Sequence, residues 1–269
     1  MNLNLNVNLK PVLRYGVFTA AIYLIFVVAM LPAQNAWGFL QPRLPGDVKL
    51  YGVDGTLWSG AAASAVINRQ EYRQLRWDFE PLALLAGRIQ YALAFNNGAS
   101  KANAVIGRSL TGNLLFQDVT ARLTAVELNT YLKLPAVRLN GAFDIDLQRL
   151  RIVDGRIVAA DGTLAWKQAG LQSPRSVVLG DLGVTLETVD DGIKGTVLDH
   201  GGALQANGIL MLSPDGEYKF TGMFASRDSA DTGLVQALRM MGKTGPDGKV
   251  NVSFSGKIPP LFIPAAAAG

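Results

Sequence analysis

The sequence predicts a mainly β protein, in which a single N-terminal transmembrane helix precedes a large antiparallel, meander-type curved β-sheet or sandwich with a few short helices. Three observations predict this fold. One uncharged apolar run, residues 15–31, is long enough to cross a bilayer. The rest of the chain is a succession of alternating apolar and polar segments, which is typical of strands with one packed and one solvated face. Short connections rich in Asn, Asp, Pro and Gly favour hairpins over parallel crossovers.

The apolar run carries no charge and is closed by Pro32. About 20 residues at 1.5 Å each span the roughly 30 Å hydrocarbon core, where a helix satisfies its own backbone groups. We therefore predict a transmembrane helix over residues 15–32. Lys10 and Arg14 precede it without any acidic residue, so residues 1–14 are expected to form a cytoplasmic tail, with the rest of the chain beyond the membrane.

Two other interpretations compete for this run. A cleaved signal peptide shares the basic start, but its apolar core is normally shorter and ends in small residues, whereas Gln34 stands two residues before Ala36. A buried core helix is disfavoured by the wholly apolar surface. Within the tail, residues 2–9 alternate leucine or valine with asparagine. An isolated strand is not stable in water, so we expect a disordered tail, with pairing to a cytoplasmic partner as the alternative.

The remaining boundaries follow composition. Residues 33–47, with two prolines and a glycine, are expected to be an extended linker; residues 48–258 a β domain on the far side of the membrane; and residues 259–269 a C-terminal tail. Asp54-Gly55-Thr56-Leu57-Trp58 recurs as Asp161-Gly162-Thr163-Leu164-Ala165-Trp166, each interpreted as a turn that opens a strand. This repeat suggests two similar halves, 48–150 and 151–258, although coincidence among glycine- and threonine-rich strands would explain it equally well.

Eight strand-like segments are the clearest: residues 56–68, 72–79, 88–95, 137–147, 177–189, 203–212, 217–224 and 249–255. Turn residues occupy positions 96–98, 190–192, 214–216 and 246–248. Three short helices are expected to pack against the sheet. One covers residues 80–87 and ends at Gly87, the second follows a capping box at residues 124–127, and the third starts at an Asp231 cap and stops at Gly242.

Composition excludes several classes of function. The chain has no cysteine, which removes disulfides, thiol nucleophiles and cysteine metal sites. After residue 14 there are 23 basic and 21 acidic residues, and no block of five like charges occurs. A nucleic-acid partner is therefore not expected.

The residues that could carry catalysis are few. His200 is the one histidine, and the Asp199 beside it would point to the opposite face of a strand, so we expect a structural role. Asp144 and Asp146 share a face but lack the further oxygens that calcium needs. Residues 54–60 resemble a phosphate loop in their glycines alone, without its lysine. We therefore predict no catalytic residue, no metal ligand and no cofactor.

Taken in order, the motifs resemble the type II secretion system protein N family over nearly the whole chain. The positions that carry the resemblance are Gly55, Thr56, Leu57, Trp58, Gly60, Trp77, Pro81, Gly162, Trp166, Gly201, Gly202, Asp215 and Gly216. The chain departs from the pattern at residues 241–246, where a leucine and a shorter approach to the last hairpin are expected, which leaves the end of the third helix open.

The resemblance implies a single-pass inner-membrane protein of a Gram-negative bacterium with its β domain in the periplasm. It implies a non-enzymatic accessory component of the type II protein secretion system, which acts by protein contacts during assembly or stabilisation, with secretin or inner-membrane platform subunits as candidate partners. The chain is also similar in architecture to the AsmA-like group. That more distant resemblance implies the alternative function, in which an apolar β groove handles lipid.

Overall fold

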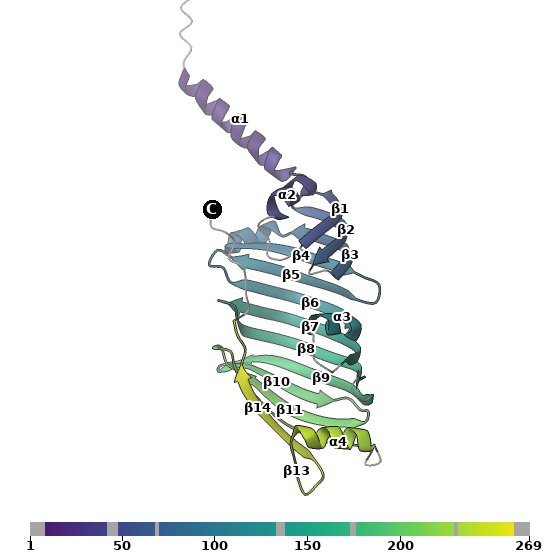
Figure 1. Cartoon of the computed structure of the whole chain (residues 1–269). Coiled ribbons are helices and arrows are strands. Elements are labelled where there is room, and N and C mark those ends of the chain that lie inside the picture. The colour runs from purple at the N-terminus through teal and green to yellow at the C-terminus, as the bar shows by residue number, and fades with distance from the viewer. Residues whose placement is uncertain are drawn as a thin grey trace, which may run out of the picture.

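One antiparallel sheet of fourteen strands forms the body of the protein. The computed structural model describes residues 9–41, 48–67, 70–132, 138–172, 176–228 and 231–260. Strand order follows the chain from β1 to β12 and ends with β14 and β13, so almost every connection is a hairpin (Figure 1). The predicted meander is confirmed. Of the two predicted alternatives, the described residues form the single curved sheet and not a sandwich.

The strands have the following bounds: β1 Val48–Gly55, β2 Ser59–Ile67, β3 Gln70–Phe79, β4 Arg88–Asn96, β5 Lys101–Ser109, β6 Leu114–Thr124, β7 Leu139–Val153, β8 Arg156–Leu171, β9 Val177–Val189, β10 Gly192–Asp199, β11 Leu204–Leu212, β12 Glu217–Ser226, β13 Lys243–Thr244 and β14 Val250–Lys257. All eight segments named from the sequence form strands. The first of them begins later than expected, at Ser59, because the preceding residues make the turn from β1.

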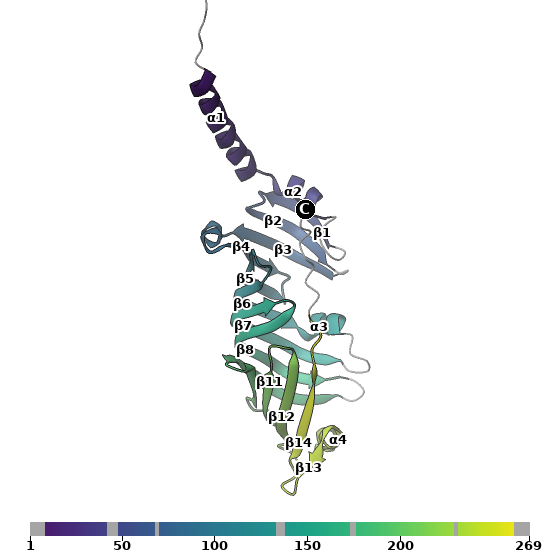
Figure 2. The ribbon, with the colours of Figure 1, turned by 90° about the vertical axis from the view of Figure 1, so that its left-hand side faces the viewer.

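Helices precede the sheet and lie beside it. They are α1 Leu9–Ala29, α2 Ala33–Leu40, the 3₁₀ helix η2 Pro81–Ala86, α3 Ala125–Leu132 and α4 Thr232–Met241. The expectation of an extended linker is wrong for residues 33–40, which form α2 and pack on β1; residues 42–47 lie outside the described residues. In both views α3 and α4 lie on the same side of the sheet, while α1 leaves from its β1 end (Figure 2).

The three predicted short helices are confirmed, with one difference at a cap. Gly87 ends η2 in the left-handed conformation, with φ 66°, and the Asp231 carboxylate accepts the N–H of Leu234 at 3.0 Å at the start of α4. Thr124 caps α3 by accepting the N–H of Glu127 at 3.4 Å. The reciprocal half of the capping box does not form, because the N–H of Thr124 donates to Ser100 instead.

Cross-strand register gives the sheet one apolar and one polar face. Pairs on the apolar face include Trp77 with Leu93, Ile106 with Phe116, Ile145 with Leu164, and Leu210 with Phe220. On the polar face, Arg122 donates to Asp144 at 2.6 and 2.9 Å, and Lys167 donates to Asp181 at 3.0 Å. Most side chains at the middle of the apolar face are half-buried, because a single layer has nothing to cover them completely.

Burial becomes complete where a helix covers the apolar face. At the far end, α4 places Leu234 and Leu238 against Leu204, Ala206, Leu179, Ala169, Val250 and Val252. At the near end, α2 buries Ala33 and Ala36. Further buried apolar residues lie between these two ends, namely Ala125 of α3, Leu147 and Ile152 of β7, and Ala159 and Ala160 of β8.

The internal repeat does not form the same structure twice. Gly55 does end β1 ahead of a turn, but Asp161 and Gly162 lie within β8, so the expected turn at the second copy is wrong. Gly162 pairs with Leu147, and the register of β7 shifts between Leu147 and Arg149. A glycine is needed there because a Cβ would lie 2.2 Å from the carbonyl oxygen of Asp146.

The N-terminal apolar run is helical over most of its length, in α1. Within the described part of the chain, no helix combines the length and the hydropathy that crossing a bilayer requires.

Candidate functional site

The motif at residues 54–60 forms a tight turn between β1 and β2. The Asp54 carboxylate accepts the N–H of Gly55 at 2.7 Å, and Gly55 has φ 88°. The hydroxyl oxygen of Thr56 accepts the N–H groups of Trp58 at 3.3 Å and Ser59 at 3.1 Å. Threonine and glycine at these positions close the turn and leave the Trp58 side chain outside both strands. Trp58 thus lies in the turn, whereas the sequence pattern predicts it within a strand.

This turn attaches α1 and α2 to the sheet. The indole N–H of Trp58 donates to the carbonyl oxygen of Val28 at 2.8 Å. The backbone N–H of Leu57 donates to the carbonyl oxygen of Leu31 at 3.0 Å, and Pro32 forms an isolated β-bridge with Thr56. The Trp58 bond is a second one to the Val28 carbonyl oxygen, which also accepts the N–H of Leu31 at 3.3 Å, and the Leu57 bond holds the residue two positions beyond the end of α1. We call this set the helix–sheet junction.

Aromatic rings pack beneath the junction. The Trp58 and Phe79 rings lie 4.9 Å apart, and Phe79 lies 5.2 Å from Tyr91. The indole N–H of Trp77 donates to the carbonyl oxygen of Thr56 at 3.1 Å. Gly60 lies against this ring, since a Cβ there would be 2.5 Å from Cζ2 of Trp77. Gly55, Thr56, Leu57, Trp58, Gly60 and Trp77 therefore form one contiguous structure.

Two apolar cavities flank the junction. The first, of about 590 Å³, lies between the last turns of α1 and the sheet; its lining includes Leu24, Ile25, Val28, Trp58, Phe79, Pro81 and Leu84. The second, of about 460 Å³, lies under α2; its lining includes Ala36, Trp37, Leu50, Trp77, Tyr91 and Leu93. Both are of a size that can hold a small ligand, and their linings are almost entirely hydrocarbon.

The comparison with protein families concerns nearly the whole sheet. Residues 46–253, which include the junction strands and all the motif positions, match the family described as "Type II secretion system (T2SS), protein N". The chain belongs to this family. Relatives named type II secretion system protein N occur in Vibrio cholerae, at 28% identity over 92% of this chain and 98% of the relative, and in Aeromonas hydrophila, at 27% over 91% and 100%. A third, from Klebsiella pneumoniae, is 26% identical over 93% of this chain and 97% of its own. No solved structure matches the chain.

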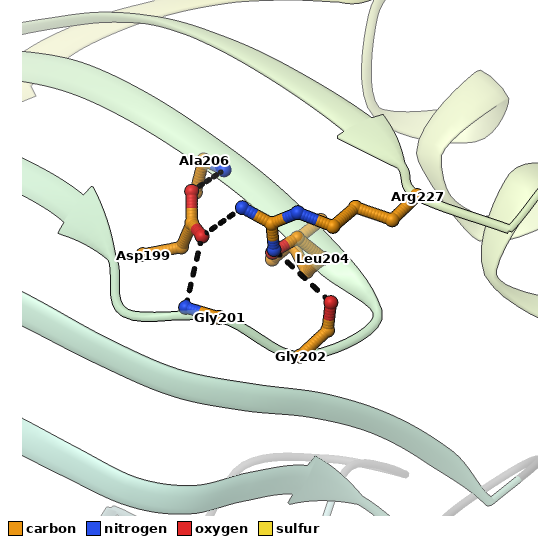
Figure 3. Close-up of polar contacts among 6 residues, drawn as sticks. All are labelled: Asp199, Gly201, Gly202, Leu204, Ala206 and Arg227. Atoms are coloured by element: carbon orange, nitrogen blue, oxygen red, sulfur yellow. Dashed lines mark hydrogen bonds and ion pairs between the residues drawn. The ribbon is translucent and has the colours of Figure 1, made fainter.

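The glycine pair at 201–202 belongs to a second cluster (Figure 3). Asp199 ends β10, and its carboxylate accepts the N–H of Gly201 at 3.2 Å and of Ala206 at 2.9 Å. Arg227, directly after β12, donates to the same carboxylate and to the carbonyl oxygens of Gly202 and Leu204. We call this set the Asp199 clamp, because it fixes the β10–β11 turn to the end of β12.

The electrostatics of the clamp follow from these contacts. Burial raises the pKa of the Asp199 carboxyl, but the N–H of Ala206, the Arg227 guanidinium and the N–H of Gly201 together outweigh burial. The pKa of Asp199 is lowered from 3.8 to about 2. On the polar face, the hydrogen bond from Arg122 likewise lowers the pKa of Asp144. These carboxylates are charged partners in the structure and do not act as proton donors at neutral pH.

The remaining motif positions lie elsewhere. Asp215 and Gly216 form the β11–β12 turn, at the other end of β11 from the clamp, and Gly216 accepts the N–H of Ile258 at 2.8 Å. Trp166 lies in β8, stacks on Phe143 with centroids 5.1 Å apart, and donates to the carbonyl oxygen of Asn140 at 2.8 Å. The motif positions thus form separate supports along the sheet and do not converge on one pocket.

The other residues considered for chemistry have structural surroundings. His200 is exposed in the β10–β11 turn, and its backbone N–H donates to Asp181. Asp144 and Asp146 share the polar face, as expected. Among the described residues, no group of three or more acidic, histidine or cysteine side chains could hold a metal ion.

Sequence reasoning missed two residues that complete these clusters. Arg227 stands 28 positions from Asp199, and Val28 contributes to the junction through its carbonyl oxygen alone. For Arg227, the sequence offers one indication, a single arginine shortly after a predicted strand. For Val28, no side-chain pattern indicates the contact, because its backbone carbonyl makes it.

Proposed function

We propose that this protein is a non-enzymatic accessory component of a type II secretion system, anchored in the inner membrane by residues 15–32 and acting through protein contacts of its periplasmic sheet. Membership of the protein N family carries the assignment to the secretion system. The residues of α1 from Tyr15 to Val28 support the anchor, since they are uncharged, almost all apolar and exposed around the helix. Such a surface is stable in hydrocarbon and unfavourable in water.

The edges of the sheet favour contact with another protein. β1 is the first strand of the order, and in the part of the chain that the structure describes its one neighbour is β2. Among the described residues, β14 pairs with β13 at Val250 and Asn251 alone, so its outer edge is open from Val252 to Lys257. An open edge offers unpaired backbone groups to an added strand.

A chromosomal deletion in the native host tests the assignment. We expect loss or slowing of export of folded proteins across the outer membrane, with restoration by the intact gene. Unchanged export together with unchanged assembly of the secretion apparatus would remove the proposal. Glycosylation or protease accessibility at both ends of the chain would test the single-pass topology separately.

Site-specific cross-linking tests the edge. A photoreactive residue placed at Ser255, exposed on β14, is compared with one at Thr163, exposed in the middle of the polar face. We expect Ser255 to cross-link to a secretin or platform subunit and Thr163 not to. Equal labelling at both positions, or none at Ser255, would refute an edge contact.

Lipid handling along the apolar face is a second candidate function. Its support is the continuous run of half-buried apolar pairs between the cavities at β1–β4 and the core beneath α4. Photoactivatable lipid in native envelopes would label Leu164 in the middle of this face if the alternative holds, and would leave Leu164 unlabelled if the face has no lipid.

A further inference from the structure

Two neighbouring loops expose a group of large apolar side chains beside α1. The leucine patch consists of Leu82, Leu84 and Leu85 of η2, Ile89 at the start of β4, and Leu110 in the β5–β6 hairpin. The loops are in contact, because the N–H of Leu110 donates to the carbonyl oxygen of Gly87 at 3.2 Å. The patch therefore comes from two parts of the chain held at one place.

These side chains are exposed to an extent that packing within the fold does not explain. Leu82 is 78% exposed, Leu85 is 88% and Leu110 is 85%. Leu82 and Leu85 are three residues apart in a 3₁₀ helix, so they project from the same side of it. A contiguous exposed apolar group of this kind marks a contact with a membrane or a partner.

The position of the patch relative to α1 favours a membrane. Leu84 and Pro81 line the same cavity as Leu24, Ile25 and Val28, so η2 lies alongside the last turns of α1. If residues 15–31 cross the bilayer, these turns lie at its far boundary. Side chains beside them are then at the level where headgroups meet acyl chains.

Charge at the patch agrees with this placement. Arg88 follows η2 directly, and Arg108 pairs in register with Ile89. Among the described residues neither arginine forms an ion pair, and the nearby Glu80 accepts a hydrogen bond from Gln90 at 2.9 Å. Arg108 is half-buried and shares the face of Ile89, whereas Arg88 lies on the opposite face with its Nε buried and without a hydrogen-bond partner among the described residues. Arg108 is therefore the cation placed to complement anionic phospholipid headgroups, toward which long basic side chains extend.

We propose that the leucine patch inserts into the periplasmic leaflet of the inner membrane next to α1, and that Arg108 binds an anionic headgroup there. This inference rests on the proposed anchoring of α1. The patch gives the protein a second membrane contact, which holds the sheet at a set angle to the bilayer. Lipid acyl chains then fill the cavity between α1 and η2.

Fluorescence quenching tests the patch on the full chain. Because the protein has no cysteine, single substitutions Leu85→Cys, Leu110→Cys, Tyr23→Cys and Met240→Cys can each carry one polarity-sensitive label. Met240 is a matched control, 84% exposed in α4 at the far end of the sheet. The proteins are reconstituted into vesicles of phosphatidylethanolamine and phosphatidylglycerol that contain brominated lipid.

We expect quenching at positions 85, 110 and 23, and none at 240. We also expect the quenching at 85 to fall in Arg108→Gln, or when phosphatidylcholine replaces phosphatidylglycerol. Quenching at 23 without quenching at 85 and 110 would refute membrane insertion of the leucine patch but support the anchoring of α1. In that case, cross-linking from position 85 in native envelopes would identify the protein that covers the patch instead. Absence of quenching at 23 would overturn the anchor itself.

Discussion

At the scale of single residues, much of the structure depends on side chains that satisfy backbone groups. Asp199 accepts one N–H group from the β10–β11 turn and one from β11, and it binds Arg227, which also donates to two carbonyl oxygens. Thr56 does the same for the β1–β2 turn. Hydrogen bonds to a charged group contribute more than neutral ones, and the loss of either partner leaves polar groups without a replacement.

The Asp199 clamp is expected to make stability depend on acid. The pKa of Asp199 is lowered to about 2 in the folded protein, so its contribution is complete above its unfolded pKa and is lost as the pH falls from about 4 towards 2. Asp199→Asn should therefore lower the free energy of unfolding by about 2 kcal/mol at pH 7, because charged hydrogen bonds are lost. Urea denaturation at pH 7, 4 and 2 would measure a difference between the proteins that shrinks with acid. Asp215→Asn, in an exposed turn, is the control; a constant difference for Asp199→Asn would contradict the assignment.

Gly60 is expected to tolerate no Cβ. Gly60→Ala would place a carbon 2.5 Å from the Trp77 ring and 2.6 Å from the carbonyl oxygen of Asp54. Overpacking of this kind should lower the free energy of unfolding by about 2 kcal/mol. Gly38→Ala is the matched control, since no atom lies within 4 Å of the new carbon and alanine favours the α2 helix. Chemical denaturation of both variants measures the free energy of unfolding. Equal values would show that the junction can rearrange to accommodate the added carbon, which would contradict the prediction.

At the scale of elements, the orientation of α1 depends on a few contacts with one turn. α1 reaches the sheet through Val28 and Leu31, and its other side chains from Tyr15 onward are exposed. A helix held by its last turn alone can swing if those contacts are removed. Trp58 contributes both the hydrogen bond to Val28 and the ring that packs on Phe79.

Trp58→Ala is therefore expected to free α1 without unfolding the sheet. Spin labels at Tyr23→Cys and Thr185→Cys would report the distance between α1 and the sheet by pulsed electron paramagnetic resonance. We expect a single narrow distribution in the parent and a broad one in Trp58→Ala. As a control, Phe254→Ala removes an aromatic ring at the far end of the sheet and should leave the distance distribution narrow. A narrow distribution in Trp58→Ala would contradict the prediction, because the backbone contacts of Leu57 and Thr56 would then be enough to hold α1 in place.

At the scale of the whole molecule, the protein is a long single-layer sheet whose strands contact their immediate neighbours (Figure 1). The buried cluster beneath α4 lies at one end, the alanines covered by α2 lie at the other, and smaller groups of buried side chains in β7 and β8 lie between them. Stability in such an arrangement is a sum of local terms, as in repeat proteins. The two ends are then able to open separately.

Leu234→Ala should test this independence. Leu234 is 2% exposed and packs in the core beneath α4, so truncation is expected to cost about 3 kcal/mol locally. Hydrogen exchange should accelerate in β11, β12 and β14 and stay unchanged in β2 to β4. Val126→Ala, at an exposed position of α3, serves as control. Equal acceleration at both ends would instead indicate a single cooperative unit.

Local features of the chain could be predicted from the sequence. The strands, the Asp231 cap and the left-handed Gly87 follow from alternation and from residues that bond their own backbone, and these are short-range effects. The extended linker expected at residues 33–40 was wrong. There the packing of two alanines and an aromatic residue on β1 favours a helix more strongly than the nearby prolines favour an extended chain. The turn predicted at the second copy of the repeat was wrong. β8 pairs with β7 on one side and with β9 on the other, and this pairing places Asp161 and Gly162 within a strand.

The sequence by itself determined the alternating strands, the hairpin order, the uncharged run and the protein N motifs, since each of these depends on neighbouring residues. Tertiary structure decided which motifs meet. Trp58, Trp77 and Val28 form one junction because a turn, a strand and the end of a helix converge there, and Asp199 meets Arg227 because β11 and β12 return the chain. It also left Leu85 and Leu110 exposed side by side, because two loops 25 residues apart close against each other through one backbone hydrogen bond, and pattern alone cannot measure that contact.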